Sequence, residues 1–167
     1  RQLNDASNPV VRVMPNTPAL IGEGMSALAS DSELDNDIKD AVQKIFDACG
    51  QALWVPNEEA IDAVTAVSGS GPAYFFLMIE NLINTGIRLG LSADVARALV
   101  IQTAKGAAGM VELSDVGPDV LRQRVTSPGG TTEAALNVFN EGDFADLVDR
   151  ALIAARDRAG ELSKDAP

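Results

Sequence analysis

Three short loops carry the residue types and spacings best suited to chemistry in this chain of 167 residues. They are Met14-Pro15-Asn16-Thr17-Pro18, Ser68-Gly69-Ser70-Gly71-Pro72 and Ser127-Pro128-Gly129-Gly130-Thr131-Thr132. Each contains proline, which fixes φ and has no N–H group. Two of them add glycine, which lets another group approach the backbone closely. Hydroxyl side chains are present in all three, and the first adds the amide of Asn16, so we take these loops as candidate binding segments.

The third loop precedes a helix that the sequence predicts over residues 133–139. Its Pro-Gly-Gly run cannot continue a helix, and we expect Thr131 or Thr132 to cap the helix that follows. The first N–H groups of a helix are unpaired and lie at the positive end of its dipole, so they favour anions. An ordinary capped helix start has the same residues. The motif alone therefore leaves both interpretations open.

Several kinds of site are disfavoured by composition. The chain has no histidine, which removes the commonest general base and metal ligand, and no carboxylates have metal-ligand spacing. We therefore expect no metal. The one cysteine, Cys49, can form no internal disulfide, which fits a cytoplasmic protein, and we expect it to be a small buried apolar side chain.

The net charge of −11 argues against nucleic acid and anionic membrane surfaces as partners. At 46% hydrophobic residues the chain can bury a substantial core, and no stretch approaches the length of a membrane span. An acidic surface also fits adaptation to high salt, and the sequence does not decide this point. We expect a folded protein whose ligands are small molecules or copies of itself.

The opening third alternates strands with one helix. We expect strands at 9–14, 24–29 and 51–55, a loop at 15–18, and a helix from Asp31 or Ser32 to about Ala48 that Gly50 terminates. Three strands are too few to close a sheet of their own. Residues 1–56 therefore read as the tail of an α/β domain.

From residue 57 on, only helices are predicted. Their expected ranges are 57–67, 73–89, 93–113, 118–125, 133–139 and a last amphipathic helix that starts at Phe144. Pro72 suits the first turn of the second of these, and Ser92 suits the cap of the third. The fold class is mainly α, with residues 57–167 forming a helical domain.

The helix at 73–89 is apolar in nearly every direction, so it must be buried on all sides. The next helix carries small residues at Ala104, Gly106, Ala107, Ala108 and Gly109, which permit close helix contact. Two such helices are more than a chain of this size covers, which favours an intertwined homodimer. Small residues that only relieve crowding in a monomer core are the alternative.

The motifs M-P-N-T-P, T-A-V-S-G-S-G-P-A-Y, G-L-S-A-D-V-A and V-T-S-P-G-G-T-T, at Met14–Pro18, Thr65–Tyr74, Gly90–Ala96 and Val125–Thr132, resemble pyrroline-5-carboxylate reductase in order and spacing. The resemblance covers almost the whole chain. It implies reduction of 1-pyrroline-5-carboxylate to L-proline with NADPH or NADH, the last step of proline biosynthesis. It also implies an N-terminal Rossmann domain and a helical dimerisation domain. The Gly-rich phosphate-binding turn of such a Rossmann domain is absent here, so we expect an incomplete cofactor site and no activity from this chain alone.

The resemblance also implies roles for the loop residues. Substrate-binding positions are Ser127, Gly129, Gly130, Thr131 and Thr132, which would hold the carboxylate. Cofactor-binding positions are Asn16, Thr17 and Pro18 near the nicotinamide, with Ser68, Ser70 and Gly71 as the wall between nicotinamide and imine. A simple break between two helices explains Ser68–Pro72 equally well. A protonated imine is already electron-poor, so catalysis would be mainly orientation, with Thr132 or a bound water as the only candidates for proton transfer.

Two alternatives remain from the sequence. One is a dimerisation module without activity of its own. The other is a two-domain hydroxy-acid reductase, which usually has Lys or His near the carbonyl oxygen. This chain's lysines lie outside all three loops, which makes that reading weaker; they are Lys39, Lys44, Lys105 and Lys164. The choice between NADH and NADPH, and any assembly of dimers into larger oligomers, stay open.

Overall fold

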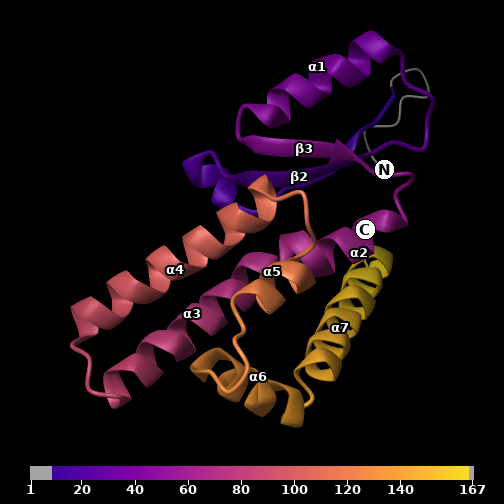
Figure 1. Cartoon of the computed structure of the whole chain (residues 1–167). Helices are drawn as coiled ribbons and strands as arrows, with labels where there is room; N and C mark the ends of the chain where they lie inside the picture. Colours follow the sequence, from indigo (N-terminus) through magenta and orange to yellow (C-terminus); the bar gives the residue numbers. More distant parts are fainter. Residues whose placement is uncertain (1–8, 166–167) are drawn as a thin grey trace. The chain divides into compact units, whose positions relative to one another are not determined.

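The computed structural model describes residues 9–165, which form two compact units. The first unit contains the residues up to Tyr74 together with those from Arg150 on, and the second is Phe75–Asp149. Helices α3 (Gly71–Arg88) and α7 (Phe144–Asp165) each contribute to both units. Figure 1 labels the elements, and each unit is described by itself.

The first unit is built on a three-stranded sheet in the order β1 (Arg12–Met14), β2 (Gly24–Ala29) and β3 (Gly50–Trp54). Strand β1 runs antiparallel to β2, whereas β2 and β3 are parallel and connected through α1 (Asn36–Asp47). Helix α1 lies along β3 (Figure 1). All three predicted strands are present, and β2 has the predicted bounds.

Helix α1 begins later than the sequence indicated. The predicted start was Asp31 or Ser32, but the helix starts at Asn36, with Asp35 as the flanking residue. Near the predicted start, the Ser30 hydroxyl donates to the Ser32 carbonyl at 3.2 Å and accepts from the Ser32 N–H group at 3.3 Å. Such local side-chain bonds compete with helix formation, which explains the delay.

The turn after α1 corrects the prediction for Cys49, whose side chain is exposed rather than buried. Its role is carried by the backbone, because the Cys49 carbonyl accepts a 2.9 Å hydrogen bond from the Gly24 N–H group. Gly50 does not end the helix directly but opens β3, with φ at +143°. A Cβ there would lie 2.1 Å from the Gly24 carbonyl oxygen, so the close approach of β2 and β3 requires glycine.

The core of this unit lies between β2 and α2 (Ala60–Val64). Ile61 is fully buried against Ala27 and Ala29 of the strand, and Met14, Val55 and Val64 pack around them. Truncation of a buried isoleucine costs about 2–5 kcal/mol of unfolding free energy. This small cluster therefore holds the helical segment that follows β3 against the sheet.

The predicted helix over 57–67 forms in two parts. Asn57 accepts from the Ala60 N–H group at 3.1 Å, as a capping residue does, and α2 follows. Thr65–Gly69 then widens into a π-helix, in which the Ser70 N–H group donates to the Thr65 carbonyl at 2.8 Å. The break expected at Ser68–Gly71 is therefore a change of helical pitch before α3 begins at Gly71.

The second unit is helical throughout. Besides α3 and α7 it contains α4 (Ala93–Leu113), α5 (Pro118–Arg124), α6 (Thr131–Glu141) and the connections between them. Helices α3 and α4 lie side by side (Figure 1), with Gly86 against the buried Ala96. The Ser92 hydroxyl accepts from the Val95 N–H group at 3.4 Å, so the predicted cap and helix bounds are confirmed.

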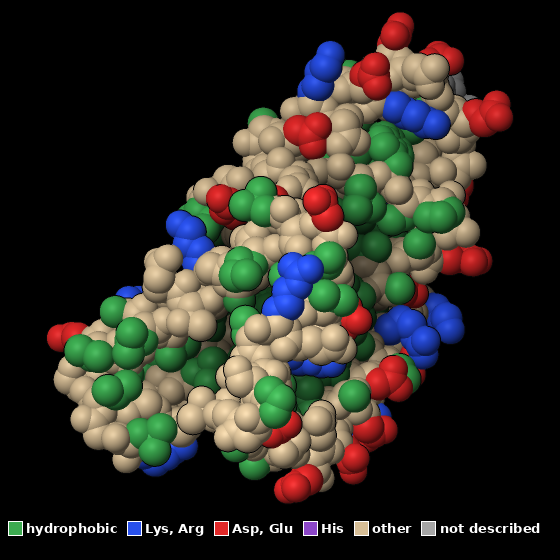
Figure 2. Space-filling model, in the orientation of Figure 1, with side chains coloured by type: hydrophobic (Ala, Val, Ile, Leu, Met, Phe, Trp, Pro, Cys, Tyr) green, Lys and Arg blue, Asp and Glu red, His purple; other side chains and the backbone are tan. Residues whose placement is uncertain are grey.

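Helix α3 is not buried on all sides within a single chain. Phe75 is 70% exposed and Phe76 is 63% exposed, so the burial that this helix's composition predicts is not supplied by the chain's own described residues. Further apolar side chains are exposed along α4 and α6, among them Leu99, Met110, Leu113 and Val138. Figure 2 shows apolar side chains, in green, on the surface over the α3–α4 hairpin.

Among the described residues, no helix combines the length and the hydropathy needed to cross a membrane.

Candidate functional site

Asn16 joins the first two candidate loops. Its Nδ2 donates to the Ser68 carbonyl at 3.2 Å, and its Oδ1 accepts from the Met25 N–H group at 2.9 Å. The side chain is partly buried, so neither bond is easily replaced by water. One amide thus fixes the loop after β1 to both the start of β2 and the π-helix.

The register of the sheet explains this contact. Met14 of β1 pairs with Ala27, and continuing the antiparallel register by two residues brings Asn16 opposite Met25. The backbone ladder stops before that point because Pro15 has no N–H group. The Asn16 side chain therefore takes the place of a backbone acceptor and extends the pairing beyond the proline.

The rest of the first loop forms a short 3-10 helix over Thr17–Ile21, labelled η1, rather than the open loop that was predicted. Thr17 and Pro18 are its first two residues, and proline suits this position because the N–H group there needs no intrahelical partner. Thr17 is exposed and Pro18 is half-buried. The Thr17 hydroxyl is therefore presented to solvent next to the Asn16 junction.

The second loop is the π-helix and the turn after it. Its Ser68 and Tyr74 hydroxyls donate to the Val64 and Ala66 carbonyls, at 3.3 and 3.0 Å. The widened turn therefore satisfies its carbonyl groups with side chains of its own segment. Single π-turns within helices frequently occur at functional sites. The sequence had suggested either a wall of the site or a simple break, and the local geometry fits both.

Gly71 adds an observation about space. It is buried, yet outside its own neighbours and helical turn no atom lies within 4 Å of the position that a Cβ would occupy. The first atom of a side chain could therefore stand at this position without a clash. Ser70, beside it, is half-buried.

The third loop is a β-turn followed by α6. The Gly130 N–H group donates to the Ser127 carbonyl at 2.9 Å, and Gly129 has φ at +70°. Proline at the second position and a positive-φ glycine at the third define a type II turn. Of the two glycines, Gly129 is thus the one that needs the left-handed region, whereas Gly130 has φ at −85°.

The expectation that a threonine caps α6 is wrong. The N-cap residue is Gly130, and Thr131 and Thr132 are the first two helical residues. A glycine N-cap needs no side-chain oxygen here, because the turn itself sets the direction of the chain. Within residues 9–165 no acceptor is found for the Thr131 and Thr132 N–H groups or for the Thr132 hydroxyl, so these groups are open to a ligand.

Glu133 is a residue that the sequence reasoning missed. Its Oε2 accepts a 2.7 Å hydrogen bond from the Gly129 N–H group, so a carboxylate of the chain already binds one amide of the turn. The signal was present, since a glutamate three residues after a helix cap commonly bonds back to the backbone. Here it bonds one residue earlier than in the usual capping box.

The structure thus joins Asn16 to Ser68 in the first unit, where Thr17, Pro18, Ser70 and Gly71 flank the junction. Ser127, Gly129, Gly130, Thr131 and Thr132 form a separate local structure in the second unit. The members of each set are neighbours in sequence, and in the first set a hydrogen bond joins Asn16 to Ser68.

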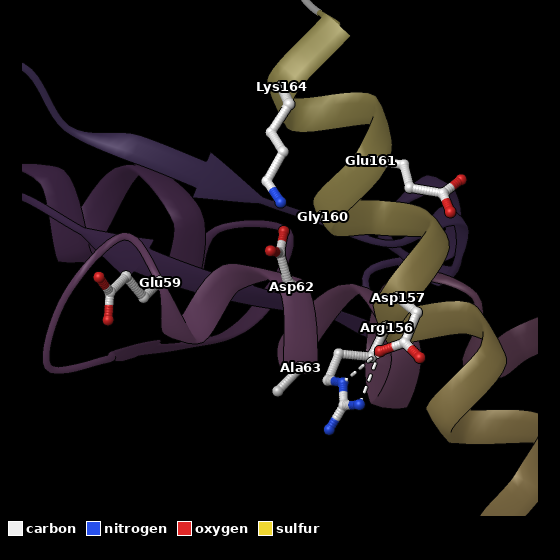
Figure 3. Close-up of a pocket in the computed structure, with 8 residues that line it drawn as sticks. All are labelled: Glu59, Asp62, Ala63, Arg156, Asp157, Gly160, Glu161 and Lys164. Carbon is white, nitrogen blue, oxygen red and sulfur yellow. Dashed lines mark hydrogen bonds and ion pairs between the residues drawn. The ribbon is translucent and has the colours of Figure 1, made fainter.

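The first unit has two shallow hollows, and no predicted site residue lines either of them. One, of about 430 Å³, is lined by Gly22, Glu23, Gly24, Met25, Gly50 and Gln51. The other, of about 400 Å³, lies between α2 and α7 (Figure 3). In it Lys164 extends toward Asp62, while Arg156 turns to Asp157, with N–O distances of 2.6 and 2.9 Å. Its charges are mixed, so it offers no surface of one sign to a charged ligand.

A family model described as pyrroline-5-carboxylate reductase dimerisation matches residues 58–162, well over half of the chain. The chain belongs to the pyrroline-5-carboxylate reductase dimerisation family.

Curated relatives bear the same family name. A pyrroline-5-carboxylate reductase of Pseudomonas aeruginosa is 50% identical over 156 residues, which are 93% of this chain and 57% of the relative. One from Mycobacterium tuberculosis is 45% identical and covers 94% of this chain and 59% of its own length. The chain thus spans less than two thirds of the pyrroline-5-carboxylate reductases that it matches.

Solved structures confirm the fold. A pyrroline-5-carboxylate reductase from Coxiella burnetii superimposes with a TM-score of 0.92 at 41% identity, over 96% of this chain and 60% of that one. A Plasmodium falciparum pyrroline carboxylate reductase with NADP bound gives 0.86 at 39% identity, over 92% and 58%. The mainly helical fold with a three-stranded sheet is therefore that of the pyrroline-5-carboxylate reductases.

Proposed function

We propose that this chain is the C-terminal part of an enzyme that reduces 1-pyrroline-5-carboxylate to L-proline with NADPH or NADH. The observation that carries the proposal is the family match, joined to the site geometry that agrees with it. All three loop motifs adopt defined structures with free polar groups. Residues 1–56 would be the end of a dinucleotide-binding Rossmann domain, and residues 57–167 a domain for substrate binding and dimerisation.

The turn and the first residues of α6 are the proposed carboxylate site. Thr131 and Thr132 offer unpaired N–H groups at the positive end of the helix, and the Thr132 hydroxyl is free to add a contact. Ser127, Gly129 and Gly130 shape the turn that exposes these groups. A carboxylate is the substrate group that such an array of donors recognises.

The Asn16 junction is the proposed contact with the cofactor. Both polar atoms of Asn16 are already used within the protein, so its role is to hold the loop that presents Thr17 and Pro18. At Gly71 the position of a Cβ is unoccupied, and Ser68 and Ser70 lie on the same segment. This segment is the proposed contact with the nicotinamide end of NADPH or NADH, which would supply the hydride.

The chemistry needs little from the protein beyond orientation. A protonated C=N bond accepts hydride readily, so pinning the carboxylate at one end fixes the carbon that reacts. Thr132 is the residue that can also relay a proton through a bound water. No metal has a part in this mechanism, and within residues 9–165 no group of His, Cys, Asp and Glu has the arrangement of a metal site.

We further propose that two copies form a homodimer through α3 and α4, with further assembly of dimers left open. The exposed Phe75 and Phe76 need a cover that a single chain does not supply. An apolar groove of about 540 Å³ lies on the second unit, lined by Gly106, Gly109, Met110, Leu113, Ser114, Leu121 and Arg124. We place the enzyme in the cytoplasm, with neither nucleic acid nor membrane as partner.

Gly106→Leu tests the dimer. No atom of the described residues outside its own helical turn lies within 4 Å of a Cβ at this position, so the new side chain meets no obstacle in its own chain. Leucine also favours the helix over glycine. We expect sedimentation at micromolar concentration to show a dimer for the unchanged chain and a larger monomer fraction for the variant. A monomer in both would refute the dimer.

The activity is tested in a chimera that joins this chain to the N-terminal part of the Pseudomonas aeruginosa relative. We expect oxidation of NADPH when 1-pyrroline-5-carboxylate is added and none with a 2-hydroxy or 2-keto acid. A folded dimeric chimera without turnover would favour the dimerisation module. Turnover with the keto acid alone would favour the hydroxy-acid reductase.

A further inference from the structure

The contact between Glu133 and Gly129 has no place in the proposed chemistry, although it lies inside the proposed carboxylate site. A glutamate there adds negative charge to a site intended for an anion. At 2.7 Å, with a charged acceptor, the hydrogen bond is short and strong. We therefore ask what this hydrogen bond contributes besides capping the helix.

The position of this bond within the turn is informative. The Gly129 N–H group belongs to the central peptide of the type II turn, between Pro128 and Gly129. Type I and type II turns differ by a rotation of this peptide through about 180°. In the type II form found here, Gly129 has φ at +70° and its N–H group points to Glu133.

A rotated peptide would change what the turn presents. Because the C=O and N–H groups of a trans peptide point in opposite directions, the Pro128 carbonyl now points away from Glu133. After rotation that oxygen would face the side of the turn on which Glu133 lies. A carbonyl oxygen there would place partial negative charge beside the free N–H groups of Thr131 and Thr132.

We propose that Glu133 is a positioning residue that locks the Pro128–Gly129 peptide in the type II orientation, and thereby keeps the donors of α6 clear for the substrate carboxylate. This inference rests on the proposed function of the same loop. Glu133 does not touch the substrate in this scheme. It acts through the turn, and what the turn needs is the acceptor oxygen rather than the negative charge.

Whether the acceptor oxygen or the negative charge of Glu133 matters distinguishes the positioning role from competition with the substrate carboxylate. If Glu133 instead competed with the substrate carboxylate for Gly129, removing its charge would strengthen binding. Glu133→Gln removes the charge and retains an acceptor oxygen, whereas Glu133→Ala removes both. Glu141→Ala is a matched control, since Glu141 is exposed and lies at the other end of the same helix.

The experiment uses the whole chain labelled with ¹⁵N-glycine. Hydrogen exchange of the Gly129 amide reports whether its bond to Glu133 is formed. Calorimetric titration with L-proline measures binding at the carboxylate site, and L-prolinamide is the probe that lacks a carboxylate. We expect Glu133→Ala to lose protection of the Gly129 amide and to bind L-proline about tenfold more weakly. Glu133→Gln and Glu141→Ala should keep that protection and bind within about threefold of the unchanged chain.

Contrary outcomes fall into two kinds. The positioning role of Glu133 is refuted if Gly129 exchange is unchanged in Glu133→Ala, or if both Glu133 variants bind L-proline more tightly. Either result leaves the proposed function standing. Equal binding of L-proline and L-prolinamide by the unchanged chain refutes the carboxylate site, and the present inference with it.

Discussion

The Asn16 junction and the Ser127–Gly130 turn both contain predicted site residues, yet they are held in opposite ways. Asn16 bonds to Ser68, 52 residues away, and to Met25 across the sheet, in a partly buried setting. The turn is closed by bonds among residues three and four positions apart, and it is largely exposed. The first depends on the fold of its whole unit, whereas the second is determined almost entirely by its own sequence.

This difference predicts that Asn16→Ala has the largest effect on stability. Two partly buried groups, the Met25 N–H and the Ser68 carbonyl, would lose their partners at once. We expect a loss of roughly 2–4 kcal/mol in unfolding free energy, measured by urea denaturation at one fixed protein concentration.

Asn16→Asp sharpens that test, because it keeps the acceptor for Met25 and removes the donor to Ser68. About half of the loss is expected to remain. Equal stability of Asn16→Ala and the unchanged chain would show that the junction is held by packing and not by its hydrogen bonds.

Gly130→Ala should have a smaller and local effect. Its Cβ would lie 2.9 Å from the Ser127 carbonyl oxygen, which is the acceptor that closes the turn, so the backbone must shift. Overpacking of this kind costs about 1–3 kcal/mol, and we expect L-proline binding to fall with it.

Gly129→Ala is the matched comparison for that variant. At Gly129 a Cβ meets no atom within 4 Å, and only the positive φ opposes it, at a cost of about 1–2 kcal/mol. Crystallography of both variants would decide the point. A turn at Ser127 that is unmoved in Gly130→Ala would contradict the steric argument.

Thr132→Val should have the smallest effect on stability, since its hydroxyl has no partner among the described residues. The expected change appears in binding instead. Loss of one hydrogen bond to a charged group weakens L-proline binding by about tenfold or more, measured by calorimetry or as KM in the chimera. Unchanged binding would mean that the hydroxyl faces away from the ligand.

Features that depend on nearby residues were predicted well from the sequence. Helix α4 and strand β2 have the predicted bounds, because the signals that set them, such as the Ser92 cap, act locally. The turn was recognised from Pro128 and its two glycines, although the threonine cap was wrong because Gly130 takes that position.

Long-range features were out of reach of such patterns. Nothing in the sequence states that Asn16 lies opposite Met25, because this follows from the register of two strands. The π-helix at Thr65–Gly69 was also missed, since it depends on bonds such as that from Tyr74 to Ala66. Cys49 was misjudged because the backbone of its turn, and not its side chain, contacts the sheet.

Asn16 and Ser68 lie 52 positions apart in the sequence, and this separation affects the order in which parts of the chain fold. A turn closed over four residues can form and dissolve on a submicrosecond timescale, before any tertiary structure exists. The Asn16 junction must wait until β1 has found its register on β2 and α2 has packed on the sheet. Contacts so distant in sequence form late and limit the rate of folding. The turn proposed to hold the substrate carboxylate would therefore form early, and the Asn16 junction would form only when the folding of its own unit is nearly complete.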